Sequence, residues 1–241
     1  MHHSFTLKNG AFILSDAHYN KTTRPHLLEF LELLSRGKLS TSQLILLGDN
    51  FDFLSYYVRD SISRNKEVID LINTLSSKLE IVIFEGNHDF NLTKLFTKSL
   101  VIPRGFQPLN AKIGSQSVTL AHGDLDVGLF YEIYRKSVES PLVIYPLGKL
   151  DTLLKNRMSS AIFRSLEHKK LCNKLGNFEN LAEKRLTKVN SDYLIEGHYH
   201  QGLIYNKNGK TYASVPALIC KKSFFLVEFD KRDLTLSFQN F

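Results

Sequence analysis

Five short apolar segments of this chain each run directly into a cluster of polar side chains, and this pattern constrains the fold more than any other feature. The segments are 11–15, 43–47, 80–84, 117–121 and 192–197, each with the length and apolar content of a buried strand. Segments with helical periodicity over 24–37 and 62–78 separate the first three. The alternation predicts an α/β fold with parallel strands.

The polar side chains after these segments are imidazoles, carboxylates and one amide. They are Asp16 and His18; Asp49 and Asp52; Asn87, His88 and Asp89; His122 and Asp124; and His198 and His200. Because ligands of open α/β sheets bind beyond the carboxyl ends of the strands, we expect the five clusters to form one site. Such donors without a thiolate suit Mn, Fe or Zn, and two divalent ions close together are a common device for displacement at phosphorus.

Each cluster alone has a simpler interpretation, because a polar residue after a strand is often a helix cap or a turn residue. In an extended segment, however, Asp16 and His18 point to the same side, as do His198 and His200. Five clusters in this order, each after a strand, favour a shared metal site over five unrelated caps.

Residues 125–190 differ from the rest of the chain, because no strand is evident and the stretches 129–136, 150–166 and 180–189 have helical periodicity. They include twelve Lys and Arg but seven Asp and Glu, and so carry +5 of the net charge of +7. We interpret 125–190 as a helical cap insertion, or lid, in a core formed by 1–124 and 191–241. We expect most of its apolar residues to pack on the core, namely Leu150, Leu153, Leu154, Met158 and Ile162.

The basic side chains of the insertion have two interpretations that stay open. They are Lys149, Lys155, Arg157 and Arg164. They either form a solvated basic face or contact substrate phosphates or anionic lipid headgroups. Arg157 and Arg164 are seven positions apart and would share a helix face.

The cysteines and the hydropathy indicate which cellular compartment we expect for the protein. Cys172 and Cys220 are far apart in sequence, so we expect neither a disulfide framework nor a thiolate metal site, in keeping with a reducing cytoplasm. No signal peptide is evident, and no segment approaches the about 18 continuous apolar residues of a transmembrane helix.

The ordered motifs SDAH, GDNFD, GNHD, AHGD and GHYH resemble those of the calcineurin-like metallophosphoesterase superfamily, over residues 11–200. The resemblance implies a four-layer α/β/β/α sandwich with two metal ions at the strand ends. It implies one ion held by Asp16, His18, Asp49 and His200, and another held by Asp49, Asn87, His122 and His198. Beside them, His88 would contact the phosphate and Asp52 would orient His88.

Within the superfamily, the stretches ILSDAHY, GDNFDF and YASVPALICKKSFFLVEF, together with the basic insertion, resemble the UDP-2,3-diacylglucosamine pyrophosphohydrolases of lipid A biosynthesis in Gram-negative bacteria. The resemblance implies hydrolysis of the substrate to UMP and 2,3-diacylglucosamine 1-phosphate, with Mn²⁺ as the expected metal. It also implies a cytoplasmic enzyme peripherally associated with the inner membrane, whose lid receives the acyl chains. The chain departs from this branch at His88, where arginine is usual, and at Leu54, where tryptophan is usual.

We therefore expect His88, Asp52 and Asn87 to act in catalysis. The residues expected to contact the substrate are Asn87, His88, Tyr131, Lys149, Lys155, Arg157 and Arg164. The expected partners are the UDP-linked glycolipid and an anionic membrane surface, without nucleic acid or an obligate protein partner. Two alternatives stay open: a metal-dependent phosphodiesterase or phosphatase for a nucleotide or another phosphoester, and a binding scaffold with an inactive site.

Overall fold

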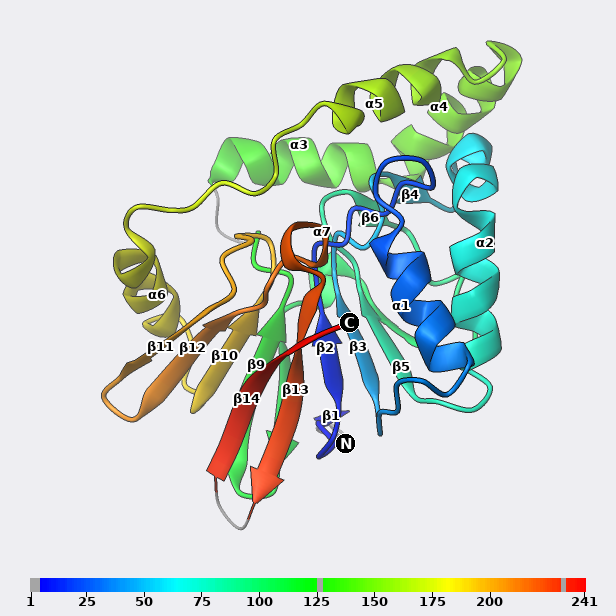
Figure 1. The fold of residues 1–241 in the computed structure, drawn as a ribbon. Helices are drawn as coiled ribbons and strands as arrows, with labels where there is room; N and C mark the ends of the chain where they lie inside the picture. Colours follow the sequence, from blue (N-terminus) through cyan, green and yellow to red (C-terminus); the bar gives the residue numbers. More distant parts are fainter. Residues whose placement is uncertain (1–4, 125–127, 231–232) are drawn as a thin grey trace.

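Two six-stranded sheets packed face to face form the centre of the computed structural model, which describes residues 5–124, 128–230 and 233–241 (Figure 1). The first sheet has the order β14 (Asp233–Asn240), β13 (Ser223–Asp230), β2 (Phe12–Leu14), β3 (Leu44–Leu47), β5 (Ile81–Phe84) and β7 (Leu100–Ile102). The second has the order β1 (Phe5–Thr6), β8 (Leu109–Ile113), β9 (Gln116–Ala121), β10 (Tyr193–Glu196), β12 (Lys210–Ser214) and β11 (Leu203–Lys207). A separate pair joins β4 (Leu54–Ser55) to β6 (Asp89–Phe90).

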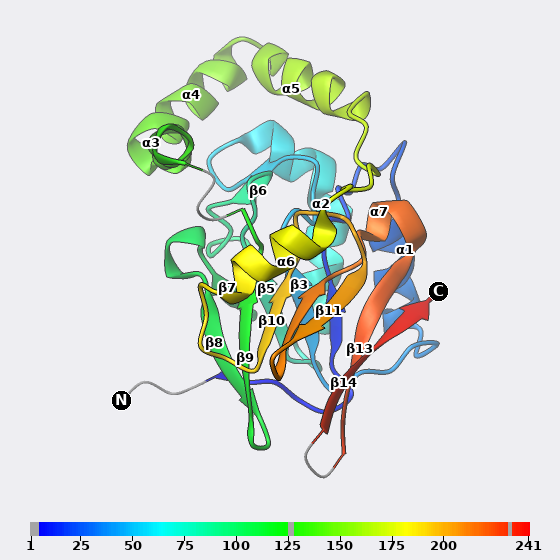
Figure 2. The same cartoon turned by 90° about the vertical axis from the view of Figure 1, so that its left-hand side faces the viewer.

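Helices cover the outer face of each sheet. Helices α1 (His26–Ser35) and α2 (Arg59–Leu75) pack on the first sheet, and α6 (Phe178–Leu186) packs on the second (Figures 1 and 2). The predicted four-layer α/β/β/α sandwich is therefore confirmed. Two short helices complete this part, the 3₁₀ turn Arg104–Phe106 and α7 (Leu218–Lys221).

The apolar residues of β3 explain why this strand is buried on both faces. Leu44 and Leu46 pack towards α1 and α2, whereas Ile45 and Leu47 pack between the two sheets. Successive side chains of a strand point to opposite faces, so a strand with helices on one side and a sheet on the other is apolar throughout. Strands β2, β3 and β5 are parallel, as are β9 and β10, so their carboxyl ends deliver the motif loops to one edge.

Three further helices stand over that edge: α3 (Leu129–Glu139), α4 (Pro141–Leu153) and α5 (Arg157–Glu167), here together called the cap (Figure 2). The cap contacts the core through a small apolar cluster in which Phe53 and Phe90 meet Ile144 and Phe163. The division at 125–190 stays a prediction, and because α6 packs on the second sheet, we propose to count it with the core layers.

The expectation for the apolar residues of 150–166 is wrong in two respects. The stretch is not one helix, because α4 ends at Leu153 and α5 begins at Arg157, with positive φ at Lys155 and Asn156 between them. Leu153 is 80% exposed and Leu150 is 44% exposed, so these side chains do not pack on the core. Helical periodicity identifies an apolar stripe but not what the stripe faces.

The prediction for the two cysteines is also wrong, because Cys172 and Cys220 form a disulfide with 5.7 Å between their Cα atoms. They are 48 positions apart in sequence, so their spacing gave no sign of a bridge. The prediction of a reducing compartment assumed that both thiols are unpaired, and the disulfide removes that assumption. No helix within 5–124, 128–230 and 233–241 has the length and hydropathy of a membrane span.

Candidate metal centre

The loops that follow β2, β3, β5, β9 and β10 bring the predicted donors together. Three groups have ligand atoms within 4.8 Å of one another: Asp16, His18 and His200; His18, Asp49 and His88; and Asp49, His122 and His198. Asp49 belongs to two of these groups. Its Oδ2 lies 3.4 Å from Nε2 of His122 and 3.9 Å from Nε2 of His18. On the far side, Oδ1 of Asp16 lies 3.2 Å from Nε2 of His200.

The Asn87 amide completes the set, since its Oδ1 lies 3.4 Å from Nε2 of His122. Asp16 and Asp49 are both almost fully buried, and two carboxylates held close together in a protein interior need a compensating cation. Within the described residues, neither ring nitrogen of the buried His18 makes a hydrogen bond. The donors therefore suit divalent metal ions, and Asp49 is shared by two of the three donor groups.

The backbone at the donors is held in a costly conformation. Asp16, His18, Asp49, His198 and His200 all have positive φ, between 43° and 63°. Residues other than glycine seldom adopt this region, and such strain clusters at functional sites. The neighbouring glycines leave room for the donors: a Cβ at Gly48 would overlap His122, and one at Gly86 would overlap the Asp49 carboxylate.

Asp89 fixes two of these loops to each other. Its carboxylate accepts hydrogen bonds from the backbone N–H groups of Asp49 (3.0 Å), Asn50 (2.7 Å), Phe51 (3.3 Å) and Gly86 (2.8 Å). It thus holds the loop after β3 against the loop after β5. Our sequence analysis placed Asp89 in the site without a role, and the four donors give it one: it positions the bridging Asp49.

The titration of the histidines reflects burial and charge. Burial lowers the pKa of His18 to about 3 and that of His198 to about 4, so both are neutral at neutral pH, the form that ligates metals. Burial also acts against a charge on His122, but the Asp49 and Asp16 carboxylates and the Leu47 carbonyl together outweigh it and raise the pKa of His122 to about 9. Nδ1 of His122 lies 3.0 Å from the Leu47 carbonyl, which leaves Nε2 for a ligand.

His88 is held by the backbone of Asp52. The partner of Nδ1 in the His88 ring is the backbone carbonyl of Asp52, at 2.7 Å, and not the Asp52 carboxylate. The carboxylate of Asp52 instead accepts from Nη1 of Arg24 at 2.6 Å and from Nδ2 of Asn20 at 3.3 Å. The backbone conformation at Asp52, rather than its side-chain charge, therefore fixes the plane of the His88 ring.

Two hollows meet at His88 and Asn87. A polar cleft of about 260 Å³ is lined by His18, Asp49, His198 and His200, and on the cap side by Lys169 and Lys170. An apolar cavity of about 370 Å³ lies between core and cap. Its lining includes Phe53, Val58 and Phe90 from the core and Ile144, Leu147, Met158, Ile162 and Leu166 from the cap. A metal-binding cleft thus continues into an apolar cavity.

The predicted substrate contacts on the cap are not brought to these hollows. Lys149, Lys155, Arg157 and Arg164 are exposed and line neither of them. The side chain of Tyr131 lies outside the part of the chain that the structure describes. Lys169 and Lys170, which our sequence analysis missed, line the metal cleft instead; their only sequence signal is a pair of lysines between α5 and α6.

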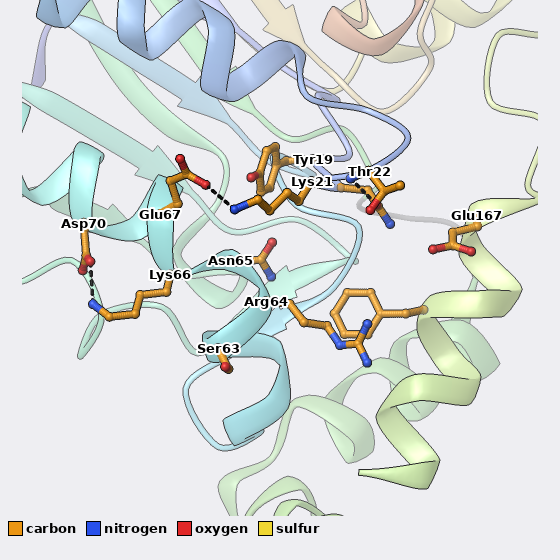
Figure 3. A pocket seen from close by; sticks show the side chains of 12 residues that line it. Tyr19, Lys21, Thr22, Ser63, Arg64, Asn65, Lys66, Glu67, Asp70 and Glu167 are labelled. Atoms are coloured by element: carbon orange, nitrogen blue, oxygen red, sulfur yellow. Dashed lines mark hydrogen bonds and ion pairs between the residues drawn. The ribbon is translucent and has the colours of Figure 1, made fainter.

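A further cleft of about 730 Å³ lies between the loop after His18, helix α2 and helix α5 (Figure 3). Its charged side chains largely neutralise one another, with Lys21 at 2.9 Å from Glu67 and Lys66 at 2.5 Å from Asp70. Arg64 lies 4.7 Å from the Phe163 ring of the cap. This cleft offers no group to the metal centre and does not belong to it.

Comparison with known proteins agrees with this geometry. The family described as "Calcineurin-like phosphoesterase" matches residues 12–202. A UDP-2,3-diacylglucosamine hydrolase of Pseudomonas fluorescens is 24% identical over 207 residues, 80% of each chain. One of Blochmanniella pennsylvanica is 26% identical over 244 residues, 95% of each chain. A dimetal phosphatase from Danio rerio has a TM-score of 0.49 at 13% identity over 95% of each chain, a likeness too distant to bear on function.

Proposed function

The chain belongs to the calcineurin-like phosphoesterase family, and from this premise we propose that it cleaves UDP-2,3-diacylglucosamine to UMP and 2,3-diacylglucosamine 1-phosphate. Membership makes it a metal-dependent phosphoester or pyrophosphate hydrolase. The relatives with this printed name, similar over 80–95% of the chain, support the choice of substrate. The observation that carries the proposal is the apolar cavity that opens beside His88 and Asn87.

The cavity suits an acyl chain. Its volume of about 370 Å³ lies within the range of ligand sites, and most of its lining is apolar, with polar groups at Asp52, Asn87, His88, Asp151 and Ser159. Each methylene group that enters it is stabilised by about 0.8 kcal/mol. A nucleotide or another small phosphoester would leave this space unused, which favours the diacylated substrate over the alternative phosphodiesterase or phosphatase activity.

Two divalent ions fit the donors in the arrangement that the resemblance implies. Asp16, His18, Asp49 and His200 would hold one, and Asp49, Asn87, His122 and His198 would hold the other. These donors suit Mn, Fe or Zn, and Mn²⁺ is our choice because it is the metal that the resemblance implies. When bound, the ions would polarise a phosphoryl oxygen and lower the pKa of an attacking water.

The protein's own side chains would bind and orient the phosphates. In its doubly protonated form, His88 donates from Nδ1 to the Asp52 carbonyl, which fixes the ring plane, and would donate from Nε2 to an oxygen of the α-phosphate as charge develops there. Lys169 and Lys170 would stabilise the charge on the departing sugar phosphate, since they line the same cleft. Asn87 lies where this cleft meets the apolar cavity and would help to set the position of the substrate.

A lipid surface is the setting that we propose for the enzyme. Helix α4 exposes Leu142 by 88% and Leu153 by 80%, beside the basic residues Lys149 and Lys155. An apolar helix face with flanking cations is typical of proteins that bind an anionic membrane surface. The substrate would reach the cavity from that surface.

Product analysis tests the proposal. The purified protein is incubated with UDP-2,3-diacylglucosamine, Mn²⁺ and a non-ionic detergent, alongside the variants Asp49→Asn and Asp70→Asn. The exposed Asp70 pairs with Lys66 on α2, so Asp70→Asn makes the same chemical change away from the metal centre. We expect UMP and the sugar phosphate from wild type and Asp70→Asn, and at least about a thousandfold less from Asp49→Asn. Turnover of a generic phosphodiester alone would overturn the assignment of the substrate.

A further inference from the structure

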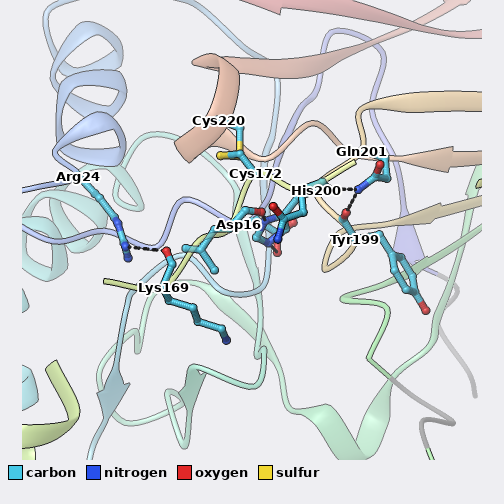
Figure 4. Close-up of a disulfide and its surroundings, with 10 residues drawn as sticks. Asp16, Arg24, Lys169, Cys172, Tyr199, His200, Gln201 and Cys220 are labelled. Atoms are coloured by element: carbon cyan, nitrogen blue, oxygen red, sulfur yellow. Dashed lines mark hydrogen bonds and ion pairs between the residues drawn. A yellow bond between two sulfur atoms is a disulfide. The ribbon is translucent and has the colours of Figure 1, made fainter. Parts of the chain in front are cut away.

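Arg24 connects the metal centre to the end of the cap. It lies on the loop that begins directly after His18, and its side chain is only 9% exposed. The loop is compact, since the backbones of Asn20 and Arg24 exchange two hydrogen bonds, of 3.2 and 2.9 Å. From this loop the guanidinium reaches across to the segment that leaves α5, where Figure 4 shows it beside the carbonyl of Lys169.

Two nitrogens of the Arg24 guanidinium donate hydrogen bonds to two different parts of the molecule. Nη1 donates to Asp52 Oδ1 at 2.6 Å, in the core. Nη2 donates to the carbonyls of Leu166 and Glu167, both at 3.0 Å, and to that of Lys169 at 3.5 Å, in the cap. The last carbonyls of a helix have no partner within the helix and carry partial negative charge, so Arg24 acts as a cap for the end of α5.

Only arginine can make both connections at once. Its planar group presents donors in a rigid fork, whereas a lysine ammonium is a single point charge on a flexible stem. Removal of the guanidinium would leave the buried Asp52 carboxylate and the end of α5 without this donor. The structure therefore couples the position of the cap to a residue whose backbone carbonyl orients His88.

The segment beyond α5 lies over the metal centre. Residues 168–175, here called the strap, form neither helix nor strand. Lys169 and Lys170 of the strap line the metal cleft, and the Leu171 carbonyl lies 2.5 Å from Nδ1 of His200. The Cys172–Cys220 disulfide joins the middle of the strap to α7 (Figure 4). Arg24 thus fixes the end of the strap at which Lys169 and Lys170 lie.

We propose that Arg24 is a positioning residue that docks the end of α5 on the core and so sets where Lys169 and Lys170 meet the substrate. The use of an acylated substrate in the test rests on the proposed function, whereas the positioning role itself does not. The expected consequence of its loss is weaker binding of a substrate that contacts both core and cap. A small phosphodiester that needs only the metal centre would be affected much less.

Steady-state kinetics of Arg24→Gln and Arg24→Lys test this with two substrates, UDP-2,3-diacylglucosamine and bis(p-nitrophenyl) phosphate. The control Arg36→Gln makes the same change at an exposed arginine that pairs with Glu32. We expect both Arg24 variants to raise KM for the acylated substrate at least about tenfold, and to change hydrolysis of the small diester by less than about threefold. An equal loss with both substrates, or no loss with either, would overturn the proposal.

Amide hydrogen exchange separates this proposal from the proposed function and from a folding defect. In Arg24→Gln we expect faster exchange in 159–175 and unchanged exchange in α2 and the two sheets, relative to wild type and Arg36→Gln. Unchanged protection of 159–175 would contradict the docking role. If wild type did not cleave the acylated substrate, the proposed function would fail, and the exchange data would still decide the role of Arg24.

Discussion

Two regions of the site, here called the floor and the roof, are stabilised in different ways. The floor consists of loops at the ends of parallel strands, where Asp16, Asp49 and His122 are almost fully buried and Asp89 joins two loops through four backbone donors. The roof is the cap together with the strap. It exposes Leu142 and Leu153, and it meets the core through a small apolar cluster and through side-chain hydrogen bonds such as that of Ser159 with Asp60. From this difference we propose that the floor performs the chemistry, while the cap and strap select the substrate and can be altered separately.

The largest effect on the roof is expected from the disulfide. Replacement of both Cys172 and Cys220 by serine opens a loop of 48 positions and should lower the free energy of unfolding by up to about 4 kcal/mol. The measurement is denaturant unfolding of the oxidised wild type and the double variant. Hydrogen exchange should show a further, local loss of protection in the strap, beyond the loss that a lower global free energy of unfolding causes everywhere. A strap that loses no more protection than the sheets would contradict the separation of roof and floor.

Metal binding should stabilise the floor. If the donors hold divalent ions in the folded state alone, Mn²⁺ at a hundredfold excess over its Kd stabilises the protein by about 2.7 kcal/mol. We expect the melting temperature of metal-stripped protein to rise on addition of Mn²⁺, and Asp49→Asn to respond less than Asp70→Asn. Equal responses of the two variants would mean that the ions bind elsewhere.

Asp89→Asn tests the support beneath Asp49. An amide cannot accept from all four N–H groups with both of its heteroatoms, so the free energy of unfolding should fall by about 2 kcal/mol. Because Asp89 positions the loop of Asp49, metal affinity should fall as well. Stability and metal affinity that match those of Asp70→Asn would remove the role that we assign to Asp89.

A bulky side chain in the apolar cavity should weaken binding of the acylated substrate without changing the metal centre. Ile162 lines the cavity and is 43% exposed, so Ile162→Trp can be accommodated while it fills space. We expect about a tenfold higher KM for the acylated substrate, worth about 1.4 kcal/mol, with unchanged hydrolysis of bis(p-nitrophenyl) phosphate. Leu153→Trp, at an exposed position outside the cavity lining, is the matched control and should behave as wild type with both substrates in detergent.

The smallest effect concerns the lipid surface. Substitution of Leu142 and Leu153 by serine removes two exposed apolar side chains from α4 and should weaken sedimentation with anionic vesicles a few-fold, by about 1 kcal/mol. Leu203→Ser, on β11 and 44% exposed, serves as the control. Activity in detergent should not change. Equal vesicle binding by both variants would move the membrane contact away from α4.

The floor was largely predictable from the sequence because its determinants are local. Apolar strands followed by glycine and polar residues placed β3 and β5 within one residue of their ends, and the order of the motifs brought the seven predicted metal ligands into one site. A hydrophobic strand that ends in ligands is a short-range pattern, and parallel pairing then determines the rest. The strand β8 was not predicted, since the apolar residues of LNAKI alternate with polar ones, unlike the continuous apolar runs of the predicted strands.

The roof was less predictable because its determinants are distant in sequence. Arg24 and the Leu166 carbonyl are 142 positions apart, and the two cysteines are 48 apart. Periodicity predicted α3 and α5, but not residues 141–149 of α4 nor the break at Lys155 and Asn156. It also did not show which faces the helices expose, so Leu150 and Leu153 were assigned to the core. The basic residues that reach the metal cleft proved to be Lys169 and Lys170, in a segment without regular structure.

The most direct test of the account compares kcat/KM for UDP-2,3-diacylglucosamine and UDP-N-acetylglucosamine, which share the pyrophosphate but differ in acyl chains. If the floor cleaves and the roof selects, wild type should prefer the acylated substrate at least about a hundredfold, because each buried methylene contributes about 0.8 kcal/mol. The preference should fall in Ile162→Trp and Arg24→Gln. Equal rates for the two substrates in wild type would contradict the account.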